Sequence, residues 1–164
     1  MATSGTYDAQ QLLATAITIE GESAANYLRA AKLVSSDSVR SVFEMLAKQE
    51  EAHKTYLTQV LESFKKARRG ALGWPEMVEV PQELLDTARA NLFPEARDPD
   101  PTTYINAVDA IRRGIQMEVD SIVLYKSLAG MAKDQSARNM FNTLALWEED
   151  HLFILNYWLG LQGR

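Results

Sequence analysis

Two copies of a Glu-x-x-His motif carry the chemistry that this sequence implies. Glu50 and His53 form the first copy, Glu148 and His151 form the second, and the chain has no other histidine. Residues three apart on a helix lie one turn apart on the same face, so each motif aims a carboxylate and an imidazole in one direction. Such ligands suit iron, manganese or zinc. A lone motif of this kind is usually a surface pair, so its surroundings decide.

Each motif lies in an apolar stripe at helical spacing, where a buried face is expected. Glu20 and Glu118 occupy similar stripes, each 30 residues before a motif (50 − 20 and 148 − 118). Four carboxylates cannot all stay charged in a dry core, because burying even one unpaired carboxylate has an idealised cost of tens of kcal/mol. Two divalent cations would neutralise them, and the imidazoles would complete the coordination.

The second half of the chain repeats the first at an offset of 98 residues (118 − 20, 148 − 50, 151 − 53). AITIEGESAANYL at 16–28 aligns with GIQMEVDSIVLYK at 114–126, and SVRSVFEMLAKQEEAH at 38–53 aligns with SARNMFNTLALWEEDH at 136–151. Bundle-forming helices share apolar residues by chance, whereas shared polar residues inside an apolar stripe need another explanation. The repeat therefore predicts two similar helical hairpins that face one site.

Four long helices must position these residues. Periodicity and capping residues predict helices at about 8–34, 37–69, 102–133 and 135–160, and a short helix around 82–92. The stretch from 70 to 101 is punctuated by Pro and Gly and is long enough to run the length of a bundle. The predicted fold class is all-α: an antiparallel four-helix bundle with one long crossover, formed as a single domain by residues 1–164.

Composition narrows the classes of partner. The formal net charge of −5 disfavours nucleic acid and anionic membranes, which prefer basic surfaces. No run of about 18 apolar residues is long enough for a transmembrane helix, and no secretory signal is evident. The chain has no cysteine, which excludes disulfides and thiolate metal sites. We expect a cytoplasmic protein.

The segments AITIEGESAANY, FEMLAKQEEAH, GIQMEVDSIVLY and FNTLALWEEDH resemble the rubrerythrin family of the ferritin-like superfamily. The resemblance covers the four long helices and implies six residues that are both metal ligands and the catalytic set: Glu20, Glu50, His53, Glu118, Glu148 and His151. It implies two iron ions, with manganese or zinc as substitutes, in an oxidoreductase that reacts with peroxide or dioxygen. A ferritin-type iron storage protein and a non-catalytic bundle stabilised by metal remain alternatives.

Two departures from rubrerythrins affect the expected partners. Rubrerythrins carry a rubredoxin-like iron site with four cysteines, which this chain lacks, so a separate donor or ferrous iron itself would supply electrons. Rubrerythrins also have a further carboxylate one turn after the third ligand glutamate, where this chain has Ser121, and Asp120 is expected to point elsewhere. This difference disfavours efficient peroxidase chemistry. We also expect a homodimer with a role in oxidative stress.

Tyr27 and Tyr125 lie two turns after Glu20 and Glu118 on the same stripes. Two interpretations stay open: each phenol either donates a hydrogen bond to a ligand carboxylate, or is a core aromatic whose hydroxyl is satisfied elsewhere.

Neighbouring residues are interpreted as structural. Glu51 and Glu149 are rotated by about 100° from the ligand face and are expected to be solvated. Trp147 and Trp158 are interpreted as packing or interface residues, and Trp74 and Met77 as covering a bundle face or a dimer contact.

Overall fold

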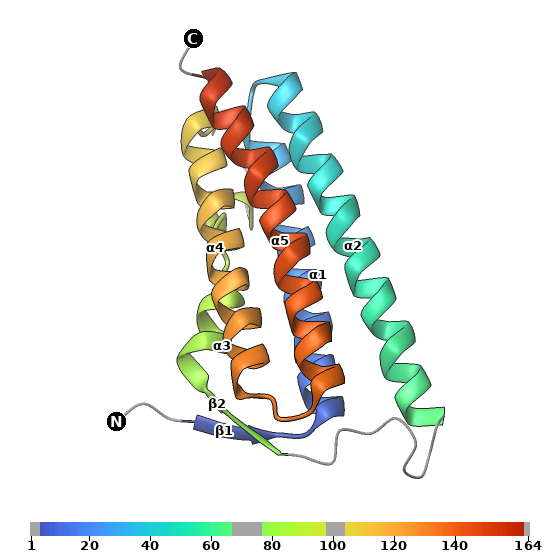
Figure 1. Cartoon of the computed structure of the whole chain (residues 1–164). Helices are drawn as coiled ribbons and strands as arrows, with labels where there is room; N and C mark the ends of the chain where they lie inside the picture. Colours follow the sequence, from blue (N-terminus) through green and yellow to red (C-terminus); the bar gives the residue numbers. More distant parts are fainter. Residues whose placement is uncertain (1–3, 67–76, 98–103, 163–164) are drawn as a thin grey trace.

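The structure is a computed structural model, and it describes residues 4–66, 77–97 and 104–162. Four long helices lie side by side (Figure 1): α1 (Ala9–Leu33), α2 (Asp37–Lys66), α4 (Ala107–Met131) and α5 (Gln135–Gln162). The first two run in opposite directions, as do the last two, and the closest backbone packing lies within these two pairs. The prediction of a mostly helical chain is confirmed.

Side-chain caps begin two of the helices close to the predicted positions. Asp8 accepts a hydrogen bond from the backbone N–H of Gln11, and the Gln11 side chain accepts one from the N–H of Asp8, both at 2.8 Å. Ahead of α5, Asp134 Oδ1 accepts from the N–H groups of Ser136 (2.9 Å) and Ala137 (3.1 Å). These caps satisfy backbone donors that have no partner inside the helix, which explains why the helices begin there.

Other boundaries differ from the prediction. α4 begins at Ala107 rather than near 102, because Asn106 caps it through a hydrogen bond from the N–H of Val108 at 2.7 Å. α4 ends at Met131 rather than 133, and α5 extends to Gln162. The predicted end of the second helix at 69 lies outside the described residues.

Two short strands are missing from the all-α prediction. β1 (Ser4–Tyr7) pairs antiparallel with β2 (Val78–Pro81), with Ser4 opposite Pro81. Four residues are too few to show a clear alternation of apolar and polar side chains, and the pairing joins segments far apart in the sequence. The short helix α3 (Gln82–Ala88) follows β2 directly and ends before the predicted 92. Met77, next to the strand, is 58% exposed.

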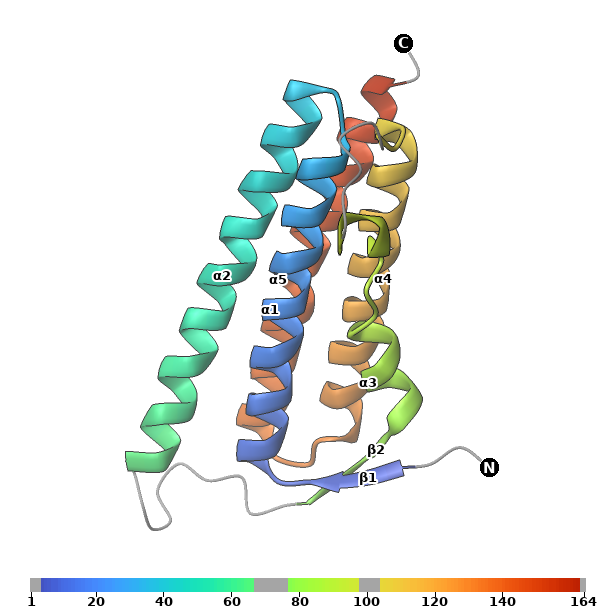
Figure 2. The same ribbon diagram turned by 180° about the vertical axis from the view of Figure 1, so that it is seen from behind.

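The segment after α3 is attached to α1 and α4. Asn26 on α1 is buried; it donates to the carbonyl oxygen of Ala90 and accepts from the N–H of Leu92, both at 3.1 Å. Arg113 on α4 donates to the carbonyl oxygen of Leu92 and to Glu95, each at 3.0 Å. These bonds hold the segment, which includes the 3-10 helix η1 (Pro94–Arg97), against the bundle (Figure 2).

The stretch for which the sequence predicts a crossover is described in part. Its described residues, 77–97, pass alongside α4 between the end of α2 and the start of α4 (Figure 2). Residues 70–76, which include Trp74, and residues 98–101 lie outside the described part.

Two apolar clusters fill the space between the helices. One includes Leu12, Leu13, Phe141 and Leu144; the other includes Phe43, Leu46, Phe93 and Ile111. Along each long helix the two clusters are separated by a layer of buried polar residues. This layer contains the predicted site, so the fold encloses it between two water-excluding cores. In the described part of the chain, no helix is long and apolar enough to cross a membrane.

Candidate metal centre

Six acidic and histidine side chains meet within the polar layer. α1 and α4 contribute one glutamate each, and α2 and α5 contribute one glutamate and one histidine each. They form two overlapping groups: Glu20, Glu50, His53 and Glu148, and then Glu50, Glu118, Glu148 and His151. Within each group, one ligand-type atom from every residue lies within 4.8 Å of the others. The fold thus brings all six predicted residues together, and the two motif glutamates belong to both groups.

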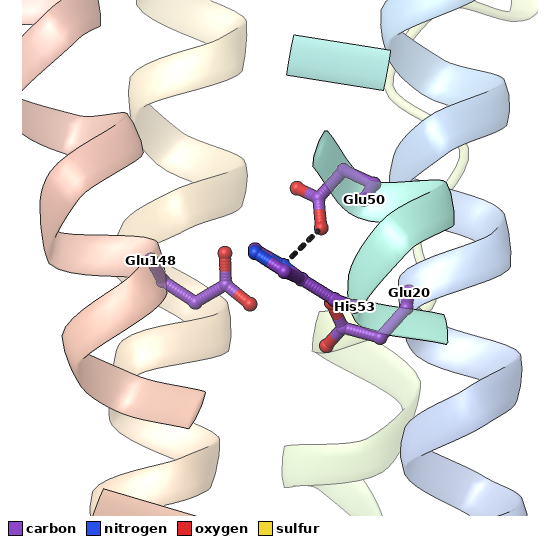
Figure 3. A group of neighbouring side chains, drawn as sticks. All are labelled: Glu20, Glu50, His53 and Glu148. Carbon is purple, nitrogen blue, oxygen red and sulfur yellow. Dashed lines mark hydrogen bonds and ion pairs between the residues drawn. The ribbon is translucent and has the colours of Figure 1, made fainter. Parts of the chain in front are cut away.

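The first group surrounds His53, whose ring extends from α2 into the space facing α5 (Figure 3). Its Nδ1 lies 3.2 Å from Glu20 Oε2 and 3.4 Å from Glu50 Oε2. Glu148 approaches the same space from the opposite helix. Three helices therefore direct their side chains at one small volume.

The second group surrounds His151 in a related way. Its Nδ1 lies 3.2 Å from Glu50 Oε1, 3.2 Å from Glu148 Oε2 and 3.5 Å from Glu118 Oε1. A single imidazole nitrogen can donate at most one proton, so three carboxylates around it exceed what hydrogen bonding can satisfy.

Several of these buried atoms have no hydrogen-bond partner in the described part of the chain. They are both carboxylate oxygens of Glu50, Oε2 of Glu148 and Nδ1 of His151. Burying such atoms without a partner is costly, and native proteins satisfy nearly all of them. Divalent cations accept electron pairs from carboxylate oxygens and from neutral imidazoles, so the donor set fits a pair of them.

Burial and mutual repulsion perturb the carboxyl groups of the centre. Burial, followed by repulsion from Glu20, raises the pKa of Glu50 well above its usual range. Burial, followed by repulsion from Glu50, raises the pKa of Glu148 in the same way. Burial lowers the pKa of His151, but the adjacent Glu118, Glu148 and Glu50 outweigh burial and raise it far above its ordinary value. Without metal, the centre retains protons that a bound cation would displace.

The tyrosines act on the carboxylates of the opposite hairpin. The Tyr27 hydroxyl donates a hydrogen bond to Glu118, and the Tyr125 hydroxyl donates one to Glu20. Both phenols are fully buried; burial, with the nearby carboxylates, raises the pKa of each well above its ordinary value, so both stay protonated as donors. Of the two interpretations left open by the sequence, the hydrogen bond to a candidate ligand is the one observed.

The structure adds one residue to the site. Trp147, interpreted from the sequence as a packing or interface residue, stacks on the ring of His53 with centroids 4.4 Å apart and planes 19° apart. The sequence repeat could have indicated a special role for Trp147, because the equivalent residue in the first half is Gln49, which is not aromatic (147 − 98). Because the repeat has an aromatic residue at only one of these two positions, Trp147 is expected to affect only one side of the centre.

The neighbouring acidic residues point away from the centre, as expected. Glu51 is paired with Lys54 at 3.2 Å, and Glu149 with Lys126 at 2.5 Å. All four side chains are substantially exposed. Glu51 and Glu149 therefore lie outside the centre.

A helical fold that encloses overlapping Glu and His groups is compatible with a carboxylate-rich metal site. The family model described as Rubrerythrin matches residues 11–159, and the chain belongs to the rubrerythrin family. Its ferritin-like fold agrees with that assignment.

Two solved structures share the fold at low sequence identity. An uncharacterized conserved protein from Magnetospirillum magnetotacticum MS-1 has 20% identity and a TM-score of 0.66, over 94% of this chain and 95% of that chain. A hypothetical protein from Pyrococcus furiosus has 19% identity and a TM-score of 0.59, over 93% of this chain and 88% of that chain. No curated protein matches the chain.

Proposed function

We propose that this protein is a di-iron carboxylate oxidoreductase that reacts with peroxide or dioxygen, as a peroxidase or a ferroxidase. The observation that carries the proposal is that two groups share Glu50 and Glu148, and that several of their buried atoms lack a hydrogen-bond partner among the described residues. Six ligands for two cations, four of them carboxylates, match the charge of two divalent ions. Iron is the metal proposed because the chain belongs to the rubrerythrin family.

The proposed architecture is the antiparallel four-helix bundle with one long crossover, formed as a single domain. The opposed directions within each helix pair and the path of residues 77–97 support it.

The residues of the chain have distinct roles in this proposal. Glu20, Glu50 and His53 would hold one ion with Glu148, while Glu118 and His151 would complete the set around the other. Tyr27 and Tyr125 orient the carboxylates that they contact and keep them from rotating. Two bound ferrous ions would supply the two electrons that, with two protons, reduce one peroxide to water. The apolar clusters on both sides exclude bulk water from this volume.

The choice between oxidants rests on the residue one helical turn after Glu118 on α4. Ser121 is buried where rubrerythrins have a further carboxylate, and Asp120 instead accepts a hydrogen bond from Gln116 at 2.8 Å. We therefore propose that the reaction with dioxygen contributes more here than in rubrerythrins. Because the chain has no cysteine, a separate donor or incoming ferrous iron would provide electrons for further turnover.

The experiment is anaerobic reconstitution with Fe²⁺, followed by rapid mixing with H₂O₂ and, separately, with O₂. Two Fe²⁺ per chain and oxidation of both by either oxidant are expected. The ratio of the two rates separates peroxidase from ferroxidase. Accumulation of many more than two ferric ions per chain would favour iron storage. Absence of any spectral change with both oxidants would contradict the proposal and leave a metal-stabilised bundle.

A further inference from the structure

Trp147 makes the two ends of the metal centre unequal. Its ring stacks on His53, and His53 stacks in turn on His151 with centroids 5.2 Å apart and planes 13° apart. The three rings therefore form one stack with His53 in the middle. Tyr56 meets the Trp147 ring edge-on, with centroids 5.4 Å apart, and is itself 48% exposed. The stack thus reaches from the interior of the centre toward solvent.

Exposure follows the same direction. The side chain of His53 is 14% exposed, whereas that of His151 is 3% exposed. The four glutamates of the centre are each 1% or 2% exposed. Water therefore reaches the centre at the His53 end, where the Trp147 ring lies.

The internal repeat shows that this cover is specific to one end. At the offset of 98 residues, Gln49 is the equivalent of Trp147 (147 − 98), and Ile154 is the equivalent of Tyr56 (56 + 98). Gln49 is exposed and has no ring. The two motifs match in sequence, so the aromatic cover on His53 is one feature that distinguishes their environments.

The packing of the helices allows the cover to move without breaking the fold. The closest backbone contacts join α1 to α2 and α4 to α5, whereas α2 and α5 face each other across the centre largely through side chains. A partly exposed ring at such a seam can change rotamer far faster than a helix pair can separate.

We propose that Trp147 is a positioning residue that holds the His53 ring and controls release of the cation bound by Glu20, Glu50, His53 and Glu148. This inference rests on the proposed dimetal centre and adds the order in which its two cations are released. The ion at the His53 end exchanges past Trp147, while the ion at the His151 end exchanges slowly. The energy of an aromatic stack corresponds to a change in release rate of about three- to tenfold.

The test loads the metal-free protein with Co²⁺ alone and follows release into excess chelator by stopped flow. Wild type is expected to hold two Co²⁺ and to release them in two phases. Trp147→Leu should accelerate the fast phase about three- to tenfold and leave the slow phase unchanged. Trp147→Phe, which keeps a ring, should restore most of the wild-type rate. Trp158→Phe, on the same helix, is the matched control and should change neither phase.

A second measurement assigns the phases to the ends of the centre. His53→Ala should remove the fast phase and His151→Ala the slow phase. Tryptophan fluorescence of the wild-type protein should recover as Co²⁺ leaves, and most of this recovery should occur at the fast rate. This measurement tests the role of Trp147 without any substitution at that position.

The outcomes separate this inference from the proposed function. Two Co²⁺ released in a single phase, or equal effects of Trp147→Leu on both phases or on neither, would overturn the role of Trp147 and leave the dimetal centre intact. Fluorescence recovery at the slow rate would also overturn it. Fewer than two Co²⁺ in the wild-type protein would overturn both proposals.

Discussion

Tyr27 on α1 donates its hydroxyl hydrogen to Glu118 on α4, and the equivalent Tyr125 on α4 donates to Glu20 on α1. Each hairpin of the repeat therefore orients a candidate ligand that belongs to the other hairpin. This exchange ties the geometry of the centre to the docking of the two hairpins, because separating them breaks both bonds together.

Replacing either tyrosine by phenylalanine is expected to weaken one end of the centre. Tyr27→Phe frees Glu118, which belongs to the His151 group, and Tyr125→Phe frees Glu20, which belongs to the His53 group. Loss of a partner that orients a ligand costs about 10- to 100-fold in metal affinity. Competition between the protein and a coloured chelator for Co²⁺ measures the two affinities. The variants should weaken different ions, and identical binding curves for both would contradict the assignment.

Removing a shared glutamate should have a larger effect on metal content than removing an unshared one. Glu50 and Glu148 occur in both groups, whereas Glu20 and Glu118 each occur in one. Elemental analysis should find Glu50→Ala well below one ion per chain and Glu20→Ala close to one. Glu51→Ala, which removes an exposed neighbour of Glu50, is the control and should keep two. Unchanged stoichiometry in Glu50→Ala would remove that residue from the centre.

The six candidate ligands could be predicted from the sequence because the information is local. Steps of three and four residues place Glu50 and His53 on one helical face, and the repeat applies the same reasoning to Glu148 and His151. A polar residue in an apolar stripe stands out without knowledge of the neighbouring helices.

The features that were missed depend on distant contacts. The sequence places Tyr27 near Glu20 on the same stripe, but helix docking decides that it contacts Glu118 instead. The stacking of Trp147 on His53 likewise depends on the distance between α2 and α5. β1 and β2 are each four residues long, so only their mutual pairing defines them.

Asn26 illustrates a polar residue whose role is structural. Its side chain bonds the backbone of Ala90 and Leu92, and it accepts a further bond from Arg29 at 3.0 Å. Asn26→Ala leaves these groups without partners and should lower the free energy of unfolding by about 1–3 kcal/mol. Urea unfolding measures the loss, and hydrogen exchange at the Leu92 amide should accelerate.

Asn156→Ala is the matched control for that substitution. The Asn156 side chain is exposed and donates only to the carbonyl oxygen of Leu152 within its own helix, at 2.9 Å. Its loss should be below about 0.5 kcal/mol. Equal losses in the two variants would show that the segment after α3 is not held through Asn26.

The raised pKa values of Glu50 and Glu148, caused first by burial, predict opposite effects of pH on the metal-free and metal-bound protein. In the unfolded chain these carboxyls ionise near pH 4.3, whereas the metal-free folded protein retains their protons to higher pH. The free energy of unfolding should therefore fall as pH rises above that value, by up to about 1.4 kcal/mol per pH unit for each group. Bound cations require ionised carboxylates, so the loaded protein should become more stable over the same range.

Urea midpoints between pH 5 and 8, with and without Co²⁺, measure how the stability of each form changes with pH. In the double variant Glu50→Gln/Glu148→Gln, the stability of the metal-free protein should depend less on pH. A metal-free protein that gains stability with pH would show that these carboxyls are already ionised in the fold.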